Sequence, residues 1–232
     1  MDKLNEYREG KILLIDKPLE WTSFNVVDKV RRQIKCKVGH GGTLDPLATG
    51  LLVIATGKKT KTLNQIQGQN KTYEGVITLG KSTPSYDLET DFDTISKYDH
   101  VNDKMIFEAT KAFTGIIYQM PPKFSALKVN GQRAYKKARK NENFKLEKRE
   151  VEIFSFEITN INLPDINFKV SCSKGTYIRS LAHDFGIYLN TASHLSSLRR
   201  TAVGDFKIED SESIDSFIQS LNINNDNNPR NR

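Results

Sequence analysis

Hydrophobic and polar residues along the chain repeat with a period of two in some segments and with helical spacing in others. The strand pattern, either alternation or a short apolar run, occurs in residues 11–15, 51–56, 71–80, 151–159 and 166–173. In residues 71–80, for example, Tyr73, Ile77 and Leu79 fall on one face of the predicted strand. Residues 151–159 and 166–173 are close enough in sequence to pair with each other.

Helical spacing of apolar residues predicts three helices, over residues 23–34, 103–113 and 177–189. Ser23 is a candidate N-cap for the first helix, and Asn102 precedes the second. Strands and helices follow one another without a regular β-α-β rhythm. The pattern therefore predicts an α+β fold, with a mixed, mainly antiparallel sheet flanked by helices.

Charge adds a possible partner to this picture. The 232 residues include 37% hydrophobic and 27% charged residues, with a formal net charge of +7. Eight basic residues lie in residues 132–149: Arg133, Lys136, Lys137, Arg139, Lys140, Lys145, Lys148 and Arg149. Such a cluster indicates either a phosphate-binding surface or a solvated basic face, and charge alone leaves both open.

Several function classes receive no support from the sequence. The two cysteines and four histidines share no metal-ligand spacing, so no metal site is predicted. The longest apolar run is too short to cross a membrane, and the first residues have no signal-peptide core. These features predict a cytoplasmic protein. The Asn-rich residues 222–232 contain almost no apolar side chain and are expected to be disordered.

The glycine-rich segment of residues 39–50, GHGGTLDPLATG, is the strongest candidate for chemistry. Its glycines allow a close approach of the backbone to a ligand, and Pro46 stiffens the chain directly after Asp45. Such a loop could hold one carboxylate in a cleft. Asp-Pro also begins ordinary turns, so Asp45 could instead be a capping residue.

The whole segment closely resembles the catalytic loop of the TruB family, the bacterial tRNA pseudouridine-55 synthases, whose pattern is G-H-x-G-[TA]-L-D-P-x-A-x-G. Further matches follow in the family's order: Asp16-Lys17-Pro18 with Thr22-Ser23, Lys71-Thr72-Tyr73, the segment 172–179 (CSKGTYIR), and Leu198-Arg199-Arg200-Thr201 with Gly204. The resemblance covers residues 8–210. It implies a pseudouridine synthase catalytic fold with a catalytic cleft, in a domain of residues 8–212.

The resemblance also implies the roles of individual residues. Asp45 is expected to be the catalytic carboxylate, Arg179 its cationic partner, and Tyr73 a ring that stacks on the uracil. Substrate-binding roles are implied for His40, Lys17, Tyr177 and Leu198. His40 would fill the space that the flipped base leaves, and Lys17 would contact a phosphate or brace the loop. Most of these residues also have a plain structural alternative: core packing for Tyr73, Tyr177 and Leu198, a satisfied loop histidine for His40, and a surface cation for Arg179.

The implied reaction converts uridine 55 in the T-loop of tRNA to pseudouridine, by base flipping and an aspartate-dependent rearrangement from an N- to a C-glycosidic bond. The basic residues lie where the family has a thumb-like insertion, here about residues 121–150, so Arg133, Lys136, Lys137, Arg139 and Lys140 are expected to bind RNA. Because the reaction involves no redox or phosphoryl step, no cofactor is expected. The expected partner is the tRNA T-stem loop, bound by a monomer without a guide RNA or protein partner.

The sequence departs from the family's pattern at three points. Glu20 occupies a position that is usually Gly, and Thr90 replaces the last Gly of the loop G-x-x-T-x-T-x-D-x-x-G. About twenty residues follow the last motif, so the C-terminal PUA domain of many relatives is expected to be absent. A guide-RNA-dependent relative and an RNA-binding module without chemistry are the two alternative functions.

Overall fold

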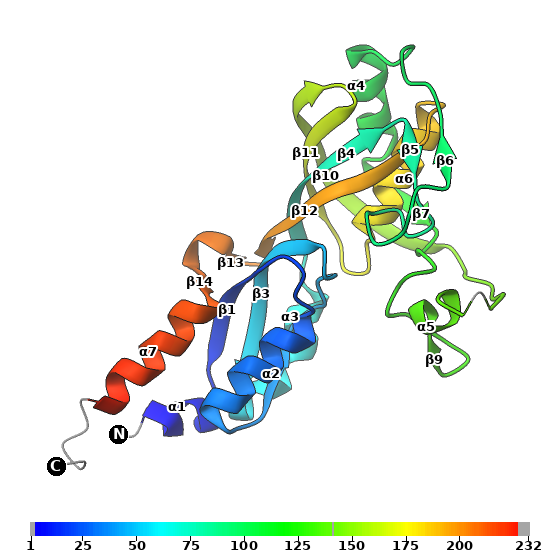
Figure 1. Cartoon of the computed structure of the whole chain (residues 1–232). Helices are drawn as coiled ribbons and strands as arrows, with labels where there is room; N and C mark the ends of the chain where they lie inside the picture. Colours follow the sequence, from blue (N-terminus) through cyan, green and yellow to red (C-terminus); the bar gives the residue numbers. More distant parts are fainter. Residues whose placement is uncertain (1–2, 141, 227–232) are drawn as a thin grey trace. The chain divides into compact units, whose positions relative to one another are not determined.

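The computed structural model describes residues 3–140 and 142–226, which pack as two compact units (Figure 1). Unit 1 extends to Lys71 and resumes at Arg199, and unit 2 comprises Thr72–Leu198. The predicted catalytic domain therefore contains residues of both units. Strand β12 (Ser193–Val203) begins in unit 2 and ends in unit 1.

Unit 1 is built around strand β3, which is buried along almost its whole length. Its strands are β1 (Ile12–Lys17), β2 (Val38–His40), β3 (Ala48–Thr56), the end of β12, β13 (Phe206–Lys207) and β14 (Glu212–Ser213). Its helices are α1 (Lys3–Glu9), α2 (Ser23–Ile34), η1 (Gly57–Thr62), α3 (Leu63–Gly68), η2 (Ile208–Asp210) and α7 (Ile214–Asp226). β3 pairs antiparallel with β1 and with β2, and β1 pairs parallel with β14.

The two faces of β3 pack against different partners because side chains alternate along a strand. Leu52 and Ile54 belong to a core cluster with residues of α2 and α7, including Val30 and Phe217. Leu51 and Val53 pack with Ile66 of α3 and Val203 of β12. The expectation of a buried strand over residues 51–56 is confirmed, and the strand begins three residues earlier.

Helix α2 has the predicted bounds, but its N-cap differs from the expected one. Thr22 is the N-cap and forms a capping box with Asn25, because the Thr22 side chain accepts from the Asn25 N–H and the Asn25 side chain accepts from the Thr22 N–H. The prediction that Ser23 caps the helix is therefore wrong. The Ser23 hydroxyl is buried and bonded elsewhere, which leaves the adjacent threonine to cap the helix.

Unit 2 has a mainly antiparallel sheet in the order β12, β4, β11, β10, β7. Its strands are β4 (which runs Lys71–Leu79 from the end of unit 1), β5 (Lys81–Ser82), β6 (Thr94–Ile95), β7 (Gly115–Gln119), β8 (Lys128–Val129), β9 (Gln132–Arg133), β10 (Arg149–Asn162) and β11 (Asp165–Cys172). Its helices are α4 (Asp103–Ala112), α5 (Ala134–Ala138) and α6 (Ile178–Tyr188). The predicted pairing of the two segments around residue 160 is confirmed as the β10–β11 hairpin.

Helices α4 and α6 of unit 2 also match the sequence pattern. The Asn102 side chain accepts from Met105 N at 3.1 Å and caps α4. Tyr177 is the N-cap of α6, whose apolar face is buried as its helical spacing predicts. Phe185 of α6 packs against Phe156 of β10, with ring centroids 5.5 Å apart, so the helix covers the sheet through aromatic contacts.

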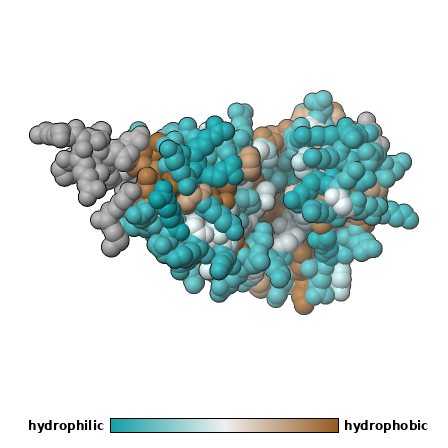
Figure 2. Space-filling model, turned by 90° about the horizontal axis from the view of Figure 1, so that it is seen from below, coloured by the Kyte–Doolittle hydropathy of each residue, from teal (hydrophilic) through white to brown (hydrophobic). Residues whose placement is uncertain are grey.

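The C-terminal prediction is corrected in part. Helix α7 continues to Asp226, so residues 222–226 are helical where disorder was expected, and residues 227–232 lie outside the described residues. The face of the molecule seen in Figure 2 is mostly hydrophilic, with small separate hydrophobic patches. Among the helices that the structure describes, none is long and apolar enough to cross a bilayer.

Candidate active site

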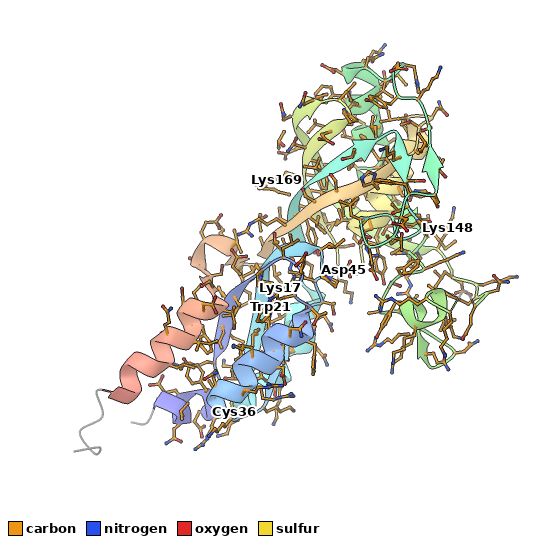
Figure 3. All side chains as sticks on the ribbon, in the orientation of Figure 1. Lys17, Trp21, Cys36, Asp45, Lys148 and Lys169 are labelled. Atoms are coloured by element: carbon orange, nitrogen blue, oxygen red, sulfur yellow. The ribbon has the colours of Figure 1, made fainter. Side chains whose placement is uncertain are left out.

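Asp45 lies in the loop that joins β2 to β3 in unit 1, residues 41–47, which we call the Asp45 loop (Figure 3). The backbone of the loop is bonded at both ends. Gly41 N donates to Val53 O at 2.8 Å, and Ala48 N donates to Asp45 O at 3.1 Å. Asp45 is half-buried. Hydrogen bonds on either side of a carboxylate restrict where it can point, which favours a fixed reacting group over a mobile surface residue.

Ser23 holds the centre of this loop with two hydrogen bonds. Its hydroxyl donates to Leu44 O at 3.1 Å and accepts from Leu44 N at 2.8 Å. Ser23 is 2% exposed and begins helix α2. The hydroxyl that was expected to cap the helix therefore anchors the residue next to Asp45.

Lys17 holds the far side of the same loop. Its ammonium donates to Pro18 O at 2.8 Å, to Trp21 O at 2.6 Å and to Pro46 O at 3.4 Å. The side chain is fully buried at the end of β1. Of the two roles considered for Lys17, this geometry fits a brace of the Asp45 loop and not a phosphate contact.

Burial lowers the pKa of Lys17 to about 8, because removal from water disfavours the charged amine. Asp45 opposes this shift, since a nearby negative charge favours the ammonium form. The positive charge of Arg200 lowers the pKa of Lys17 further. The ammonium form still predominates at neutral pH. The positive charge behind the loop in turn favours the ionised form of Asp45.

His40 ends β2, directly before the Asp45 loop. Its Nδ1 accepts from Gly42 N at 3.3 Å, which requires an unprotonated nitrogen. Burial lowers the pKa of His40, so the neutral form matches this hydrogen bond. The side chain satisfies the loop backbone in this conformation, as the plain alternative for a loop histidine predicts.

Glu20 has a left-handed backbone, with φ +64°, and its N–H donates to Pro46 O at 2.9 Å. A residue with a Cβ is disfavoured in this conformation, whereas glycine adopts it readily. The conformation explains why glycine suits this position. The bond to Pro46 makes this turn another contact of the Asp45 loop.

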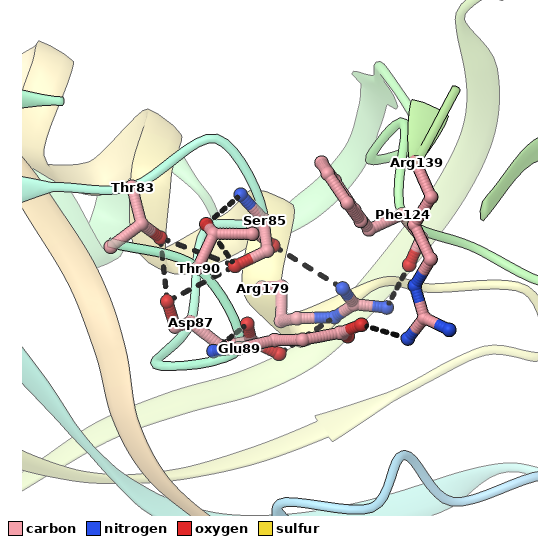
Figure 4. Close-up of polar contacts among 8 residues, drawn as sticks. All are labelled: Thr83, Ser85, Asp87, Glu89, Thr90, Phe124, Arg139 and Arg179. Carbon is pink, nitrogen blue, oxygen red and sulfur yellow. Dashed lines mark hydrogen bonds and ion pairs between the residues drawn. The ribbon is translucent and has the colours of Figure 1, made fainter. Parts of the chain in front are cut away.

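In unit 2, Arg179 lies in the first turn of α6 and is 4% exposed (Figure 4). Its guanidinium donates to Ser85 O at 3.2 Å and to Phe124 O at 2.9 Å, and its Nε lies 3.6 Å from an Asp87 oxygen. A buried cation at a helix N-terminus is unfavourable unless it is paired. The carboxylate and the two carbonyls supply that pairing, so Arg179 is not a surface cation.

The loop that carries Asp87 departs from the family's pattern at Thr90, and the structure shows what the threonine does (Figure 4). The Thr90 hydroxyl accepts from Ser85 N at 3.2 Å and lies 2.9 Å from the Ser85 hydroxyl. The Ser85 hydroxyl also donates to Asp87 O at 3.1 Å. The threonine therefore adds hydrogen bonds to the turn whose Ser85 carbonyl accepts from Arg179.

Gln119, at the end of β7, holds the backbone at the start of α6. Its Nε2 donates to Tyr177 O at 2.9 Å, and its Oε1 accepts from Tyr177 N at 2.8 Å. Ser180 adds a hydrogen bond to Met120 O at 2.7 Å. These bonds fix the helix end that bears Arg179, while the Tyr177 side chain stays half-buried.

The other predicted residues of unit 2 lie on strands. Tyr73 is on β4 and 8% exposed, on the same face as Ile77 and Leu79. Leu198, on β12, is half-buried. Lys17, His40 and Asp45 thus belong to unit 1, whereas Tyr73, Tyr177, Arg179 and Leu198 belong to unit 2.

The five basic residues that were predicted to bind RNA lie in residues 120–148, between β7 and β10, which we call the basic insertion. A surface hollow is lined by Lys128, Gly131, Gln132, Arg133, Tyr135, Lys136, Arg139 and Lys140. Lys136 and Lys140 are exposed. The Lys137 ammonium lies 3.1 Å from a carboxylate oxygen of Glu142, and the Arg139 guanidinium lies 2.6 Å from a carboxylate oxygen of Glu89. The predicted cations therefore divide into open and ion-paired ones.

Sequence reasoning missed Ser23, Gln119 and Arg200 as residues of the site. Arg200 was noticed only as part of a matched segment, and its 1% exposure is visible only in the structure. The one available signal for Gln119 was a polar residue at the end of an apolar strand. In the part of the chain that the structure describes, no group of three or more histidine, cysteine or acidic residues could hold a metal ion.

Comparisons with known proteins match this arrangement. Residues 29–178 match the TruB family pseudouridylate synthase (N terminal domain). A Flavobacterium johnsoniae protein named tRNA pseudouridine synthase B is 51% identical over 224 residues, covering 93% of this chain and 98% of that protein. The protein of the same name from Phocaeicola vulgatus is 48% identical, covering 93% and 94%.

Solved structures with a similar fold include Cbf5 complexes. A chain from an archaeal box H/ACA sRNP Nop10-Cbf5 complex has a TM-score of 0.70 at 26% identity, covering 94% of this chain and 55% of that one. A chain from a Cbf5-Nop10-Gar1 complex has a TM-score of 0.72 at 29% identity, covering 93% and 56%. The protein thus spans little more than half the length of these solved chains.

The α+β fold and the anchored aspartate loop place the protein in the class of pseudouridine synthases, enzymes that isomerise uridine in RNA. Within that class, the chain belongs to the TruB family.

Proposed function

We propose that the enzyme isomerises uridine 55 in the T-loop of tRNA to pseudouridine, with Asp45 as the catalytic carboxylate. The observation that carries the proposal is the Asp45 loop, in which hydrogen bonds from Ser23 and Lys17 hold the residues on either side of the aspartate. The relatives named tRNA pseudouridine synthase B support tRNA as the substrate.

The reaction breaks the N1–C1′ bond of the uridine, turns the base and joins C5 to C1′. The proton on C5 is lost and N1 gains one, so atoms and electrons balance without an oxidant or a reductant. An ionised carboxylate can stabilise or attack an electron-poor carbon, as in retaining glycosidases. Attack on the sugar and attack on the base both use the ionised form of Asp45, which the buried Lys17 ammonium favours.

The uridine must leave its stack before the reaction, which costs a few kcal/mol. The family resemblance assigns Tyr73 to stack on the uracil and Arg179 to pair with the catalytic carboxylate. It assigns His40 to the space that the flipped base leaves, and Tyr177 and Leu198 to the pocket wall. The buried position of Arg179 supports a functional cation, because a guanidinium removed from water requires anionic or carbonyl partners.

The basic insertion supplies the rest of the proposed tRNA contact. Arg133, Lys136 and Lys140 are exposed on or beside a surface hollow, where they can neutralise phosphates of the T-stem. Lys137 and Arg139 would exchange their glutamate partners for phosphates. The enzyme is proposed to act as a cytoplasmic monomer, without a guide RNA, a protein partner or a cofactor.

The test is Asp45→Asn, assayed by tritium release from unmodified tRNA labelled at uridine C5. Wild-type protein with tRNA alone should release tritium, which distinguishes this function from that of a guide-dependent enzyme. The variant should bind tRNA normally but lose activity by a factor on the order of 10⁴ or more, as enzymes do when a reacting group is removed. Near-normal release by the variant would remove Asp45 from the reaction, and pseudouridine mapped to another position would remove uridine 55.

A further inference from the structure

Arg200 lies behind the Asp45 loop and is one of the most deeply buried long side chains among the described residues, with 1% exposure. It lies on β12, within the part of the strand that belongs to unit 1. Its Nε donates to Leu51 O at 2.8 Å, and its two terminal nitrogens donate to Gly42 O at 3.2 Å and Thr43 O at 3.4 Å. One guanidinium therefore connects β3 to the first half of the Asp45 loop.

This half of the loop depends on outside anchors because of its composition. Gly41 and Gly42 are consecutive glycines, and Gly42 has φ +137°, a conformation that glycine adopts without steric cost. The same freedom allows the segment to move. The other half is stiffer, because Pro46 restricts the backbone and Ser23 bonds Leu44 at both its N–H and its carbonyl.

The chemistry of arginine suits this position. Its guanidinium is always charged and presents five donors in a rigid plane, so it can bond several carbonyls at fixed angles. Among the described residues, the hydrogen bonds of Arg200 go to backbone carbonyls and no carboxylate forms an ion pair with it. Burying a cation that has no bonded carboxylate costs free energy. The reason for a charged residue at this position is therefore best sought in the carbonyls that it orients and in the nearby Asp45 loop.

We propose that Arg200 is a positioning residue for the catalytic step, because it holds the Gly42–Thr43 backbone and thereby sets where Asp45 points. The inference rests on the proposed role of Asp45. It gives Arg200 no contact with the substrate: a fully buried guanidinium reaches neither the uridine nor a phosphate. Loss of Arg200 would leave three carbonyls without their donor and the glycine pair free to move.

The experiment compares Arg200→Met, Arg200→Lys and the control Arg32→Met in single-turnover assays at saturating enzyme, with tRNA affinity measured in parallel. Arg200→Met should slow the reaction roughly 100-fold, the scale expected for a misplaced reacting group. Its Kd for tRNA should change less than about threefold, because phosphate contacts are untouched. Arg200→Lys should lose only about tenfold, since one ammonium has three donors but cannot reproduce the planar set.

Arg32→Met removes an arginine from the surface of unit 1, where it pairs with Asp28, and should react at the wild-type rate. A normal rate in Arg200→Met, or a weaker Kd with a normal rate, would overturn the inference. Should Arg200→Met not fold, Arg200→Lys decides: a tenfold loss of rate at unchanged Kd supports positioning, and a wild-type rate refutes it.

Asp45→Asn in the same assay separates the two proposals. Activity in Asp45→Asn would overturn both, whereas an inactive Asp45→Asn beside a fully active Arg200→Met would overturn only this one.

Discussion

The Asp45 loop and the basic insertion both have cationic side chains in or next to them, but the environments of these cations are opposite. The cations behind the Asp45 loop, Lys17 and Arg200, are buried and donate to backbone carbonyls. Those of the basic insertion, such as Lys136 on the short helix α5 and Lys140 in the turn after it, are exposed. The same type of side chain thus fixes a backbone in one region and faces solvent in the other.

The difference follows from what each region is proposed to do. A carboxylate that must meet one carbon atom needs a fixed position, and a buried donor gives it one because no water competes for the carbonyls. A phosphate-binding surface needs charges that can reach an approaching polyanion, and exposed lysines retain that freedom. Substitutions in the Asp45 loop should therefore affect folding and chemistry, and substitutions in the basic insertion should affect binding.

The largest effect is expected for Gly50→Ala, on β3 directly after the Asp45 loop. Gly50 has φ +101°, and an added Cβ would lie 2.4 Å from Arg200 O and 2.8 Å from Arg200 N. The substitution should lower the free energy of unfolding by about 3 kcal/mol or more, because backbone atoms cannot move aside cheaply. Urea unfolding followed by circular dichroism measures the change.

Gly131→Ala is the matched control in the basic insertion. Gly131 also has a positive φ, +81°, but no atom lies within 4 Å of the position of an added Cβ. Only the conformational cost of about 1–2 kcal/mol remains. Equal losses of stability in the two variants would contradict the view that β3 next to the Asp45 loop is more tightly packed than the basic insertion.

The second prediction separates open from paired cations in the basic insertion. Lys136→Gln with Lys140→Gln should weaken tRNA binding roughly 10- to 50-fold near physiological salt and flatten its salt dependence, because each lost phosphate contact removes about 0.9 from the slope. The rate at saturating enzyme should stay close to that of the wild type. Kd measured at several salt concentrations gives both quantities.

The comparison pair is Lys137→Gln with Arg139→Gln, whose charges are already partly neutralised by Glu142 and Glu89. Its effect on affinity should be smaller, since each contact with phosphate must first replace an ion pair. Affinity and slope that are unchanged in both double variants would show that the insertion is only a solvated basic face.

A smaller effect is expected at Glu20, where the backbone is left-handed. Glu20→Gly should raise the free energy of unfolding by up to about 1 kcal/mol. The left-handed backbone strains a residue that has a Cβ, and glycine removes this strain. The gain exceeds the extra conformational entropy that glycine loses when the chain folds. Glu20→Gln keeps the Cβ and should leave stability unchanged. If both variants were equally stabilised, the cause would be the charge of Glu20 and not its backbone.

The smallest effect is expected for Glu89→Gln, which weakens the 2.6 Å ion pair with Arg139. Partly exposed pairs of this kind contribute about 0.2–1 kcal/mol, so releasing Arg139 for phosphate should tighten tRNA binding by no more than about threefold. Weaker binding in this variant would mean that Glu89 holds Arg139 in its binding position instead of competing with RNA for it. Titration of labelled tRNA at low salt measures the difference.

Local patterns predicted five strands and three helices, but they missed β7, β12 and α7 among the longer elements. The strands around β3, β4, β10 and β11 and the helices α2, α4 and α6 occur within a few residues of their expected bounds, because alternation and helical spacing report which face is buried. The cap of α2 was misassigned by one residue, since Thr22 and Ser23 are both good caps and only the contact of Ser23 with Leu44 separates them. The helical residues 222–226 were missed because propensity is weak there.

The sequence by itself determined the type of protein and the residue proposed for its chemistry, because the glycine-rich aspartate segment is a continuous string whose pattern can be read without the fold. Only the tertiary structure decided what holds that aspartate in place. Arg200 is 157 and 158 residues away from the two loop carbonyls that it bonds, and Gln119 is 58 residues from the Tyr177 backbone. Such contacts have no local signal, because a buried arginine and a surface arginine look the same in sequence until the chain has folded around one of them.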